Sequence, residues 1–213
     1  MLDLKHTLAK NYFDGLQFYW QAFKELKSFI NALGETLGSD FVPAGNNVWV
    51  HKSAIIAPSA YLGESVIIGA RTEVRHCAFI RGSTLIGEGC VVGNSTEIKN
   101  SVLFDGVQAP HFNYVGDSIL GYKSHLGAGA VTSNVKSDKS AITAHMCGVK
   151  AVTGLKKLGA LVGDYAEIGC GSVLNPGSVI GKGASVYPLC SVRGYVPPDS
   201  IFKSQTSINK KTG

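Results

Sequence analysis

The chain has 213 residues, of which 45% are hydrophobic and 16% are charged, and its formal net charge at pH 7 is +5. This composition is typical of a soluble globular protein, and the scattered lysines and arginines argue against nucleic acid as a partner. The sequence has no run of eighteen apolar residues and no secretory signal, so we expect neither a membrane span nor a membrane partner. Five cysteines without a Cys-x-x-Cys pair favour a reducing compartment, and we expect the cytoplasm.

The first part of the chain has the pattern of an amphipathic helix. Large apolar residues recur at helical spacing from Leu16 to Leu33, with charged residues on the other side. Glycines follow at Gly34 and Gly38, as expected where a helix ends. We therefore assign residues 1–47 to an N-terminal helical segment that either caps the end of the main domain or docks a partner.

From Val48 onward the hydrophobic pattern repeats every six residues. A large apolar residue and, two positions earlier, a small one recur together. The large residues are Val50, Ile56, Leu62, Ile68, Val74, Ile80, Ile86, Val92, Ile98 and Phe104, and after a gap Val162, Ile168, Leu174, Ile180, Val186 and Val192. A period of six predicts short strands that stack as a solenoid, with the large residues inside. Cys90 and Cys190 occupy the small position, which indicates packing residues.

This pattern is the hexapeptide repeat, and the sequence resembles the left-handed parallel β-helix family. The resemblance implies an all-β, left-handed parallel β-helix with three sixes in each triangular coil, and self-association as a homotrimer. We assign residues 48–203 to this domain, with an inserted loop at about 136–159 where the repeat is lost, and residues 204–213 to a tail. Residues eighteen apart then lie on successive coils, about 4.8 Å from each other.

The eighteen-residue step brings two cations together and singles out one histidine. Arg81 and Lys99 would be stacked at an outward corner, where they repel each other unless an anion joins them. A bound phosphate is one interpretation, and two solvated surface cations are the other. His111 lies eighteen residues after Gly93, which would leave space for a ligand. The repeat loses its frame at His111, with Pro110 in place of a large aliphatic residue, so we expect a functional site there.

Two longer stretches carry a more specific resemblance. Residues 92–134 resemble the acetyltransferase domain of the bifunctional N-acetylglucosamine-1-phosphate uridylyltransferase/glucosamine-1-phosphate acetyltransferase enzymes. The letters are VGNSTEIKNSVLFDGVQAPHFNYVGDSILGYKSHLGAGAVTSN. Residues 153–183, TGLKKLGALVGDYAEIGCGSVLNPGSVIGKG, are similar to the β-helix half of archaeal sugar-1-phosphate nucleotidylyltransferases, some of which also acetylate amino sugars.

This resemblance implies roles for individual residues. His111 takes the place of the catalytic base. Arg81 and Lys99 fall on contacts to the sugar phosphate, and Tyr114 falls on a contact to the sugar. Asn134 matches an asparagine near the acyl group, and it is the candidate donor to the oxyanion of the reaction.

Further contacts follow from the same comparison. Ala128 takes the place of a backbone contact to coenzyme A. His125 stands where the bacterial enzymes have an asparagine that touches the sugar, so we class it as a substrate contact. Lys136, in the inserted loop, and Lys203 are candidates for binding coenzyme A, whose phosphates attract lysines. The alternative for the loop is a solvated segment without a ligand.

The implied activity is N-acetylation of an amino-sugar phosphate resembling glucosamine-1-phosphate, or of a nucleotide amino sugar, in the supply of UDP-N-acetylglucosamine. Acetyl-CoA is the co-substrate, transfer is direct with histidine as general base, and no metal is required. The partners are therefore a sugar phosphate, coenzyme A and two further copies of the chain. We do not expect nucleotidylyltransferase activity, because the chain has no Gly-rich phosphate loop.

Two alternatives stay open at this point. A zinc enzyme of the γ-carbonic-anhydrase type uses the same solenoid but needs three histidines on one metal, and the six histidines here form no close pair. A non-catalytic solenoid that binds a sugar nucleotide, or serves a structural purpose, is the other alternative.

Overall fold

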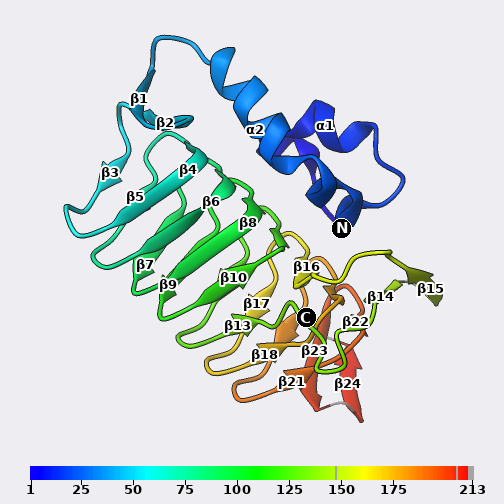
Figure 1. The fold of residues 1–213 in the computed structure, drawn as a ribbon. Coiled ribbons are helices and arrows are strands. Elements are labelled where there is room, and N and C mark those ends of the chain that lie inside the picture. Colours follow the sequence, from blue (N-terminus) through cyan, green and yellow to red (C-terminus); the bar gives the residue numbers. More distant parts are fainter. Residues whose placement is uncertain (147, 205, 211–213) are drawn as a thin grey trace.

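The computed structural model describes residues 1–146, 148–204 and 206–210, and within them the predicted parallel β-helix is confirmed (Figure 1). Short parallel strands stack coil upon coil on three faces, numbered here in the order in which the chain passes through them. Faces 1 and 3 share a 13-stranded sheet because β4, β6 and β8 bend around the corner between them, and face 2 is a 9-stranded sheet.

The strands of each face are as follows. Face 1 contains β2 (Val48–His51), the second halves of β4 (Tyr61–Ile68), β6 (Phe79–Ile86) and β8 (Glu97–Leu103), and then β11 (Ile119–Leu120), β16 (Ala160–Val162), β19 (Ser178–Ile180) and β22 (Tyr195–Val196). Face 2 contains β3 (Ile55–Ile56), β5 (Glu73–Val74), β7 (Val91–Asn94), β9 (Gln108–His111), β12 (His125–Leu126), β17 (Glu167–Ile168), β20 (Ser185–Val186) and β23 (Ser200–Ser204). Face 3 contains the first halves of β4, β6 and β8, and then β10 (Tyr114–Gly116), β13 (Val131–Thr132), β18 (Val173–Leu174) and β21 (Ser191–Val192). Antiparallel strands flank the two ends, β1 (Phe41–Gly45) beside β2 and β24 (Ser207–Lys210) beside β23.

The core of the solenoid is formed by the large residues of the six-residue repeat. One member of the predicted set is wrong, because Leu103 and not Phe104 pairs with Ile86, although Phe104 is buried as well. The small position behaves as expected, since Cys90 and Cys190 are both buried. Burial raises the pKa of the Cys90 thiol to about 12, which keeps it protonated and unreactive at neutral pH.

The repeat loses its frame earlier than the sequence suggested. Ile80 still pairs with Ile98, but Lys99 then lies opposite Gly82, so Arg81 is an extra residue in its strand. Such a bulge shifts the pairs that directly follow it by one position. The prediction that the frame breaks at His111 is therefore wrong, and the cause is that one residue is absorbed at Arg81.

The shift also changes the residue that lies beneath His111. Asn94 pairs with His111, whereas Gly93 lies against Pro110, whose carbonyl oxygen would clash with any Cβ at that glycine. The predicted open space under His111 is thus wrong. The glycine serves the close approach of two coils, which only a residue without a side chain permits.

The N-terminal segment is broken into short helices. These are η1 (Leu4–His6), α1 (Lys10–Asp14), η2 (Tyr19–Lys24) and α2 (Leu26–Glu35). The prediction of one continuous helix is wrong, because residues 19–24 adopt the tighter 3-10 form that buries Trp20 and Ala22. Among the described residues, no helix has both the length and the apolar character needed to cross a membrane.

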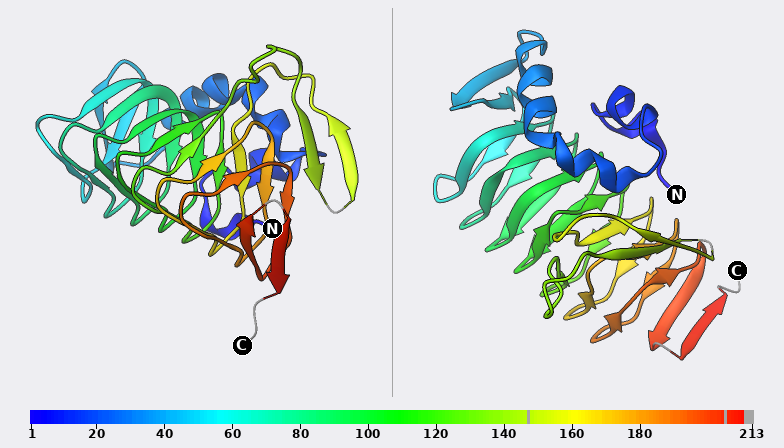
Figure 2. Two further views of the ribbon diagram at one scale, coloured as in Figure 1. Left: turned by 90° about the horizontal axis from the view of Figure 1, so that it is seen from below. Right: turned by 45° about the vertical axis from the view of Figure 1, so that its right-hand side comes forward.

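This segment lies along face 1 and not over the end of the solenoid (Figure 2). At the first coil the ring of Trp49 fills the place of a side chain at Gly34. Several coils further along, the backbone N–H of Asp105 donates to the carbonyl of His6 at 3.0 Å, and the His6 ring stacks on Tyr122 with centroids 3.6 Å apart. The segment is therefore held at both ends of its length.

The outward side of face 1 explains why a cover is needed. A row of apolar side chains alternates with the inward ones, and its members are at most 1% exposed: Ile67, Leu85, Val102, Ile119, Leu161 and Val179. Side chains that point away from the prism would meet water unless another element covered them. Helix α2 packs on β4 and β6, and α1 and η2 lie over Leu161.

The inserted loop forms a hairpin of β14 (Thr143–Met146) and β15 (Val149–Val152), which projects beside the N-terminal helices (Figure 2). One side of the hairpin is apolar: Ala144 and Met146 border a cavity of about 130 Å³ with Phe18 and Trp20. Its other side, described below, is polar. This alternation is the period-2 pattern of a strand with two environments.

Candidate functional site

The corner between faces 3 and 1 carries Arg81, Lys99 and Asn134, three of the residues that the sequence singled out. We call it the polar edge, and it consists of the residues at the corner where the chain leaves face 3: Arg81, Lys99, Asn100, Gly116, Asp117, Ser133, Asn134, Asn175 and Arg193. Each coil contributes one or two of them. The geometry of the solenoid thus lines up residues that lie far apart in the chain.

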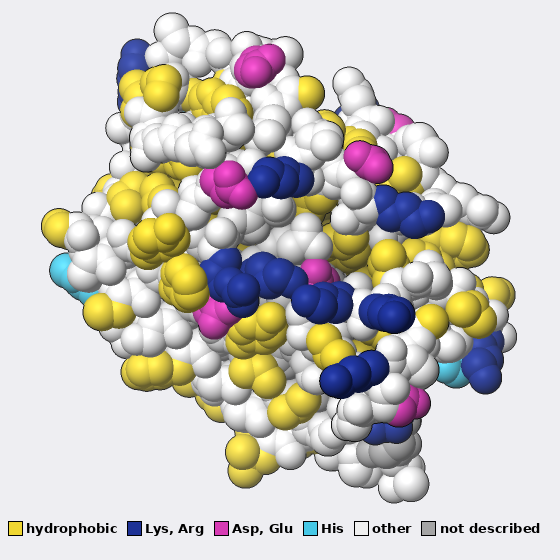
Figure 3. Space-filling model, in the orientation of Figure 1, with side chains coloured by type: hydrophobic (Ala, Val, Ile, Leu, Met, Phe, Trp, Pro, Cys, Tyr) yellow, Lys and Arg dark blue, Asp and Glu magenta, His cyan; other side chains and the backbone are white. Residues whose placement is uncertain are grey.

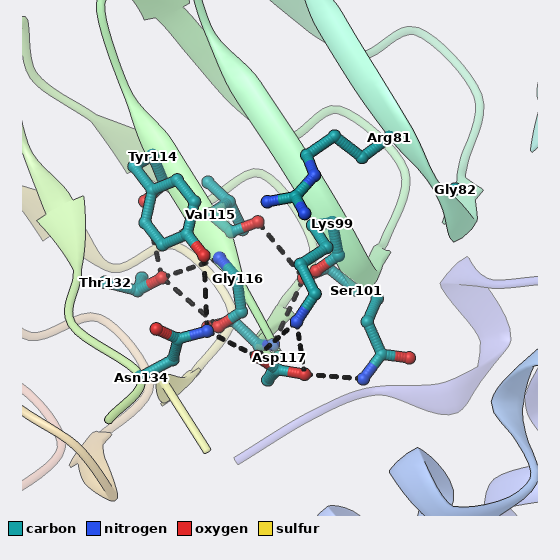
Figure 4. A network of polar contacts seen from close by, with 12 residues as sticks. Arg81, Gly82, Lys99, Ser101, Tyr114, Val115, Gly116, Asp117, Thr132 and Asn134 are labelled. Atoms are coloured by element: carbon teal, nitrogen blue, oxygen red, sulfur yellow. Dashed lines mark hydrogen bonds and ion pairs between the residues drawn. The ribbon is translucent and has the colours of Figure 1, made fainter. Parts of the chain in front are cut away.

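Asp117 is the centre of a hydrogen-bonded network on this edge (Figure 4). Its side chain is only 4% exposed, and its carboxylate accepts from Lys99 Nζ at 3.0 and 3.2 Å. Asn100 Nδ2 donates to it at 2.6 Å, and Asn134 Nδ2 donates to its other oxygen. A buried carboxylate is stable only with such partners, and this one has a cation and two amides.

Asn134 extends the network to Tyr114. Its Nδ2 also donates to the Tyr114 hydroxyl oxygen at 3.2 Å, so both amide hydrogens are used within the chain. The role of Asn134 as donor to an oxyanion stays a prediction, and in this arrangement its amide group serves Tyr114 and Asp117. Burial first, and then the negative charges of Asp117 and Glu97, raise the pKa of Tyr114, which keeps the phenol protonated.

Each of the two cations is paired with a carboxylate of the same chain. Arg81 Nη1 lies 2.9 Å from Glu97 Oε1, and this hydrogen bond raises the pKa of Arg81. Lys99 is neutralised by Asp117. Carboxylates of the same chain thus supply an anion to each cation, so the charge of these two side chains does not by itself require a bound phosphate.

His111 lies on a different corner, between faces 2 and 3. It is exposed, and its backbone N–H donates to Asn113 Oδ1 at 3.1 Å. Asn113 is buried and its Nδ2 donates to two carbonyls of the next coil, which makes it a structural staple of the bend. The neighbouring Phe112 is 61% exposed in a left-handed conformation, φ 51°. Within one chain, His111 is not part of the network around Asp117.

The remaining predicted residues are spread over other parts of the surface. On face 2, His125 Nδ1 lies 2.9 Å from Glu167 Oε2, beside a shallow depression of about 380 Å³. Ala128 is exposed on the same corner as His111, one coil further. Lys203, on β23, lies with its Nζ 5.2 Å from the centre of the Tyr187 ring. One chain therefore brings together Lys99, Tyr114 and Asn134. It places His125, Ala128 and Lys203 elsewhere on the surface.

Lys136 borders a cleft of about 570 Å³ between the hairpin and the polar edge. The basic side chains around this cleft are Lys136, Lys150, Arg193 and His145, with Asp138 as the carboxylate. Lys136 Nζ donates to the Ala141 carbonyl at 2.8 Å, which fixes the base of the loop. Figure 3 shows lysine and arginine side chains in a row across the middle of the face it presents, a distribution that suits an anionic ligand.

Sequence reasoning missed Asp117, Glu97 and Asn100. One signal was available, because Asp117 is eighteen residues after Lys99 and ends the stretch QAPHFNYVGD. Within the described part of the chain, no three His, Cys, Asp or Glu side chains lie close enough to hold a metal ion.

The fold and the polar edge define a hexapeptide-repeat β-helix protein, and comparison with known proteins confirms the predicted resemblance. Residues 72–158 match the family described as GMPPB C-terminal domain. The bifunctional sugar-1-phosphate nucleotidylyltransferase/acetyltransferase of Sulfurisphaera tokodaii is 33% identical over 103 residues, 48% of this chain and 26% of that protein. The bifunctional protein GlmU of Leifsonia xyli subsp. xyli is 35% identical over 149 residues, 68% of this chain and 26% of that protein. The chain thus spans about a quarter of the length of these relatives.

Solved structures give a more distant likeness. UDP-N-acetylglucosamine O-acyltransferase from Moraxella catarrhalis matches 76% of this chain and 70% of its own, with 15% identity and a TM-score of 0.39. A variant of perosamine N-acetyltransferase from Caulobacter crescentus, in complex with CoA and GDP-perosamine, matches 78% of this chain and 57% of its own, with 20% identity and a TM-score of 0.36.

Proposed function

We propose that this chain is an acetyl-CoA-dependent N-acetyltransferase that acts on an amino-sugar phosphate or a nucleotide amino sugar, and that it works as a homotrimer. The observation that carries the proposal is the network of Lys99, Tyr114 and Asn134 around Asp117. It joins a cation and a phenol in one network at the polar edge, where hydroxyl and phosphate oxygens of a sugar would find donors. The sequence relatives named above support the same activity.

The position of His111 supports the proposed trimer. This histidine is exposed on the corner between faces 2 and 3, whereas the polar edge lies between faces 3 and 1. An imidazole on one corner and sugar contacts on another meet when two copies pack corner to corner. We therefore assign each active site to two copies, one providing His111 and the other providing the polar edge.

The reaction is direct acyl transfer. The sugar amine attacks the thioester carbonyl of acetyl-CoA while neutral His111 takes a proton from the nitrogen. The C–N bond forms, the C–S bond breaks, and the proton passes from His111 to the departing thiolate of coenzyme A. Acetyl amide and free coenzyme A are the products, and no covalent intermediate with the chain is needed.

Coenzyme A would place its phosphates in the cleft below the hairpin. Lys136, Lys150 and Arg193 border this cleft, which is large enough for a nucleotide. Replacement of Lys150 by alanine should raise the KM for acetyl-CoA several-fold, because one phosphate contact is lost. Lys156→Ala is the matched control, because Lys156 is an exposed lysine of the same loop that does not border the cleft.

The activity is tested by offering acetyl-CoA with a panel of amino-sugar phosphates and nucleotide amino sugars while free thiol is measured. We expect His111→Ala to lower kcat by about 10²–10⁴-fold, the usual contribution of a general base. His76→Ala is the control, since His76 is exposed on the same corner two coils earlier. Equal activity of the wild type and His111→Ala would refute the role of the histidine.

The shared site is tested by mixing two inactive variants, His111→Ala and Lys99→Ala, in equal amounts during refolding. If one copy provides His111 and its neighbour provides Lys99, random mixing restores about a quarter of the wild-type activity, because each interface has a one-in-four chance of joining two intact residues. No recovery would place both residues in one copy's site, or would show that the copies do not associate.

A further inference from the structure

The hydroxyl of Tyr114 has a defined orientation. Its oxygen accepts a hydrogen bond from Asn134 Nδ2 at 3.2 Å. A phenol that accepts in this way keeps its own hydrogen for another acceptor. The tyrosine is therefore arranged as a donor, provided that Asn134 presents its NH₂ group and not its carbonyl oxygen.

Asp117 decides which way Asn134 faces. The buried carboxylate accepts from Asn134 Nδ2, and if the amide turned over, two oxygens with lone pairs would face each other. The same carboxylate accepts two contacts from Lys99 Nζ. Asp117 itself is held by Asn100 and by the inserted loop, where the N–H of Gly159 donates to its carbonyl at 2.9 Å.

We propose that Asp117 is a positioning residue for the acceptor: through Asn134 it sets the Tyr114 hydroxyl as a donor, and directly it holds Lys99 in the same network. The ligand class is a sugar with a hydroxyl or phosphate oxygen at this point, which receives one neutral and one cationic hydrogen bond. The inference rests on the proposed function for the identity of the ligand, but the arrangement of the side chains can be tested without turnover.

The first test follows the ionisation of Tyr114 by NMR in protein with ¹³C-labelled tyrosine rings, and Tyr114→Phe identifies the signal. Asp117→Asn should lower the pKa of Tyr114, because a nearby negative charge is removed. Asn134→Leu should raise it, because the donor that stabilises the phenolate is lost. Local unfolding would not produce opposite shifts, and Asn100→Ala, which removes only one donor to Asp117, is the control.

The second test uses activity. Asp117→Asn should lower kcat/KM for the acceptor by about 10²-fold, the cost of a misplacement near 1 Å. In a Tyr114→Phe background the same change should cost much less, because the two residues act as a unit. The inference would be overturned by two results together. The effects of Asp117→Asn and Tyr114→Phe on kcat/KM would be independent, and the pKa of Tyr114 would be unchanged in both Asp117→Asn and Asn134→Leu.

The two proposals can fail separately. If the wild type acetylates no amino sugar, the proposed function fails, while the two opposite pKa shifts still decide whether Asp117 orders the edge. If Asp117→Asn does not fold, Asn134→Leu replaces it in both tests, because it removes the hydrogen bonds that link Asp117 to Tyr114.

Discussion

Removal of the Phe13 side chain should show whether the N-terminal segment is an integral part of the fold. Phe13 lies on α1, is 1% exposed, and its ring centre is 5.8 Å from that of Phe104 and 5.6 Å from that of Tyr19. Because it is packed from several sides, Phe13→Ala leaves a cavity between the segment and face 1. Such a change destabilises a protein by about 3–5 kcal/mol.

This loss is large enough to measure. For a chain of this size, 1 kcal/mol corresponds to about 2–4 °C in Tm, so Phe13→Ala should melt roughly 6–20 °C below the wild type. The control is Phe112→Ala, because Phe112 is 61% exposed. Its replacement should change the stability of the isolated chain by about 0.5 kcal/mol or less.

Urea unfolding followed by tryptophan fluorescence is a suitable assay, because Trp20 lies in the segment and Trp49 lies in β2. We expect Phe13→Ala to shift the signals of both tryptophans, each observed alone in a Trp→Phe background. The reasoning is refuted if Phe13→Ala unfolds at the same urea concentration as Phe112→Ala, since the segment would then contribute nothing to face 1.

Three further predictions concern single residues. Burial raises the pKa of Asp105 to about 6, so the folded state binds its proton more tightly than the unfolded state, and stability should fall as the pH rises from about 4 to 6. In Asp105→Asn this decrease of the urea midpoint with pH should be absent. Gly93→Ala should cost about 1–3 kcal/mol, because its Cβ would meet the next coil, whereas Gly38→Ala, in open space, should be neutral in thermal melts. Peptide mapping after thiol labelling of the native protein should find Cys77 modified and Cys90 protected; modification of Cys90 at the rate of Cys77 would contradict its burial.

The sequence carried more information about face 1 than the six-residue period displayed. Ile67 and Leu85 come directly before the inward Ile68 and Ile86, so apolar residues occupy both sides of this strand position. On face 2 the corresponding outward residues include Glu73 and Glu167. A face that is apolar on both sides must be covered, and the aromatic N-terminal segment is the element that could cover it.

The hexapeptide period determined the solenoid and its core because side-chain size at every sixth position is a local property that survives small shifts of register. It could not determine which residues meet on the edges. The bulge at Arg81 moves the partners in the next coil by one position, so Lys99 pairs with Gly82 and not with Arg81, and Asn94 takes the place expected for Gly93 under His111.

The tertiary structure also decided which charged groups of the site lie together. Sequence spacing placed two cations together, but only the folded chain shows that Asp117 neutralises Lys99 and that Glu97 neutralises Arg81. The reason is physical: hydrophobic patterning acts through burial, which any apolar side chain of suitable size satisfies, whereas a hydrogen bond or ion pair requires atoms within about 3 Å, a precision that depends on the register of every preceding coil.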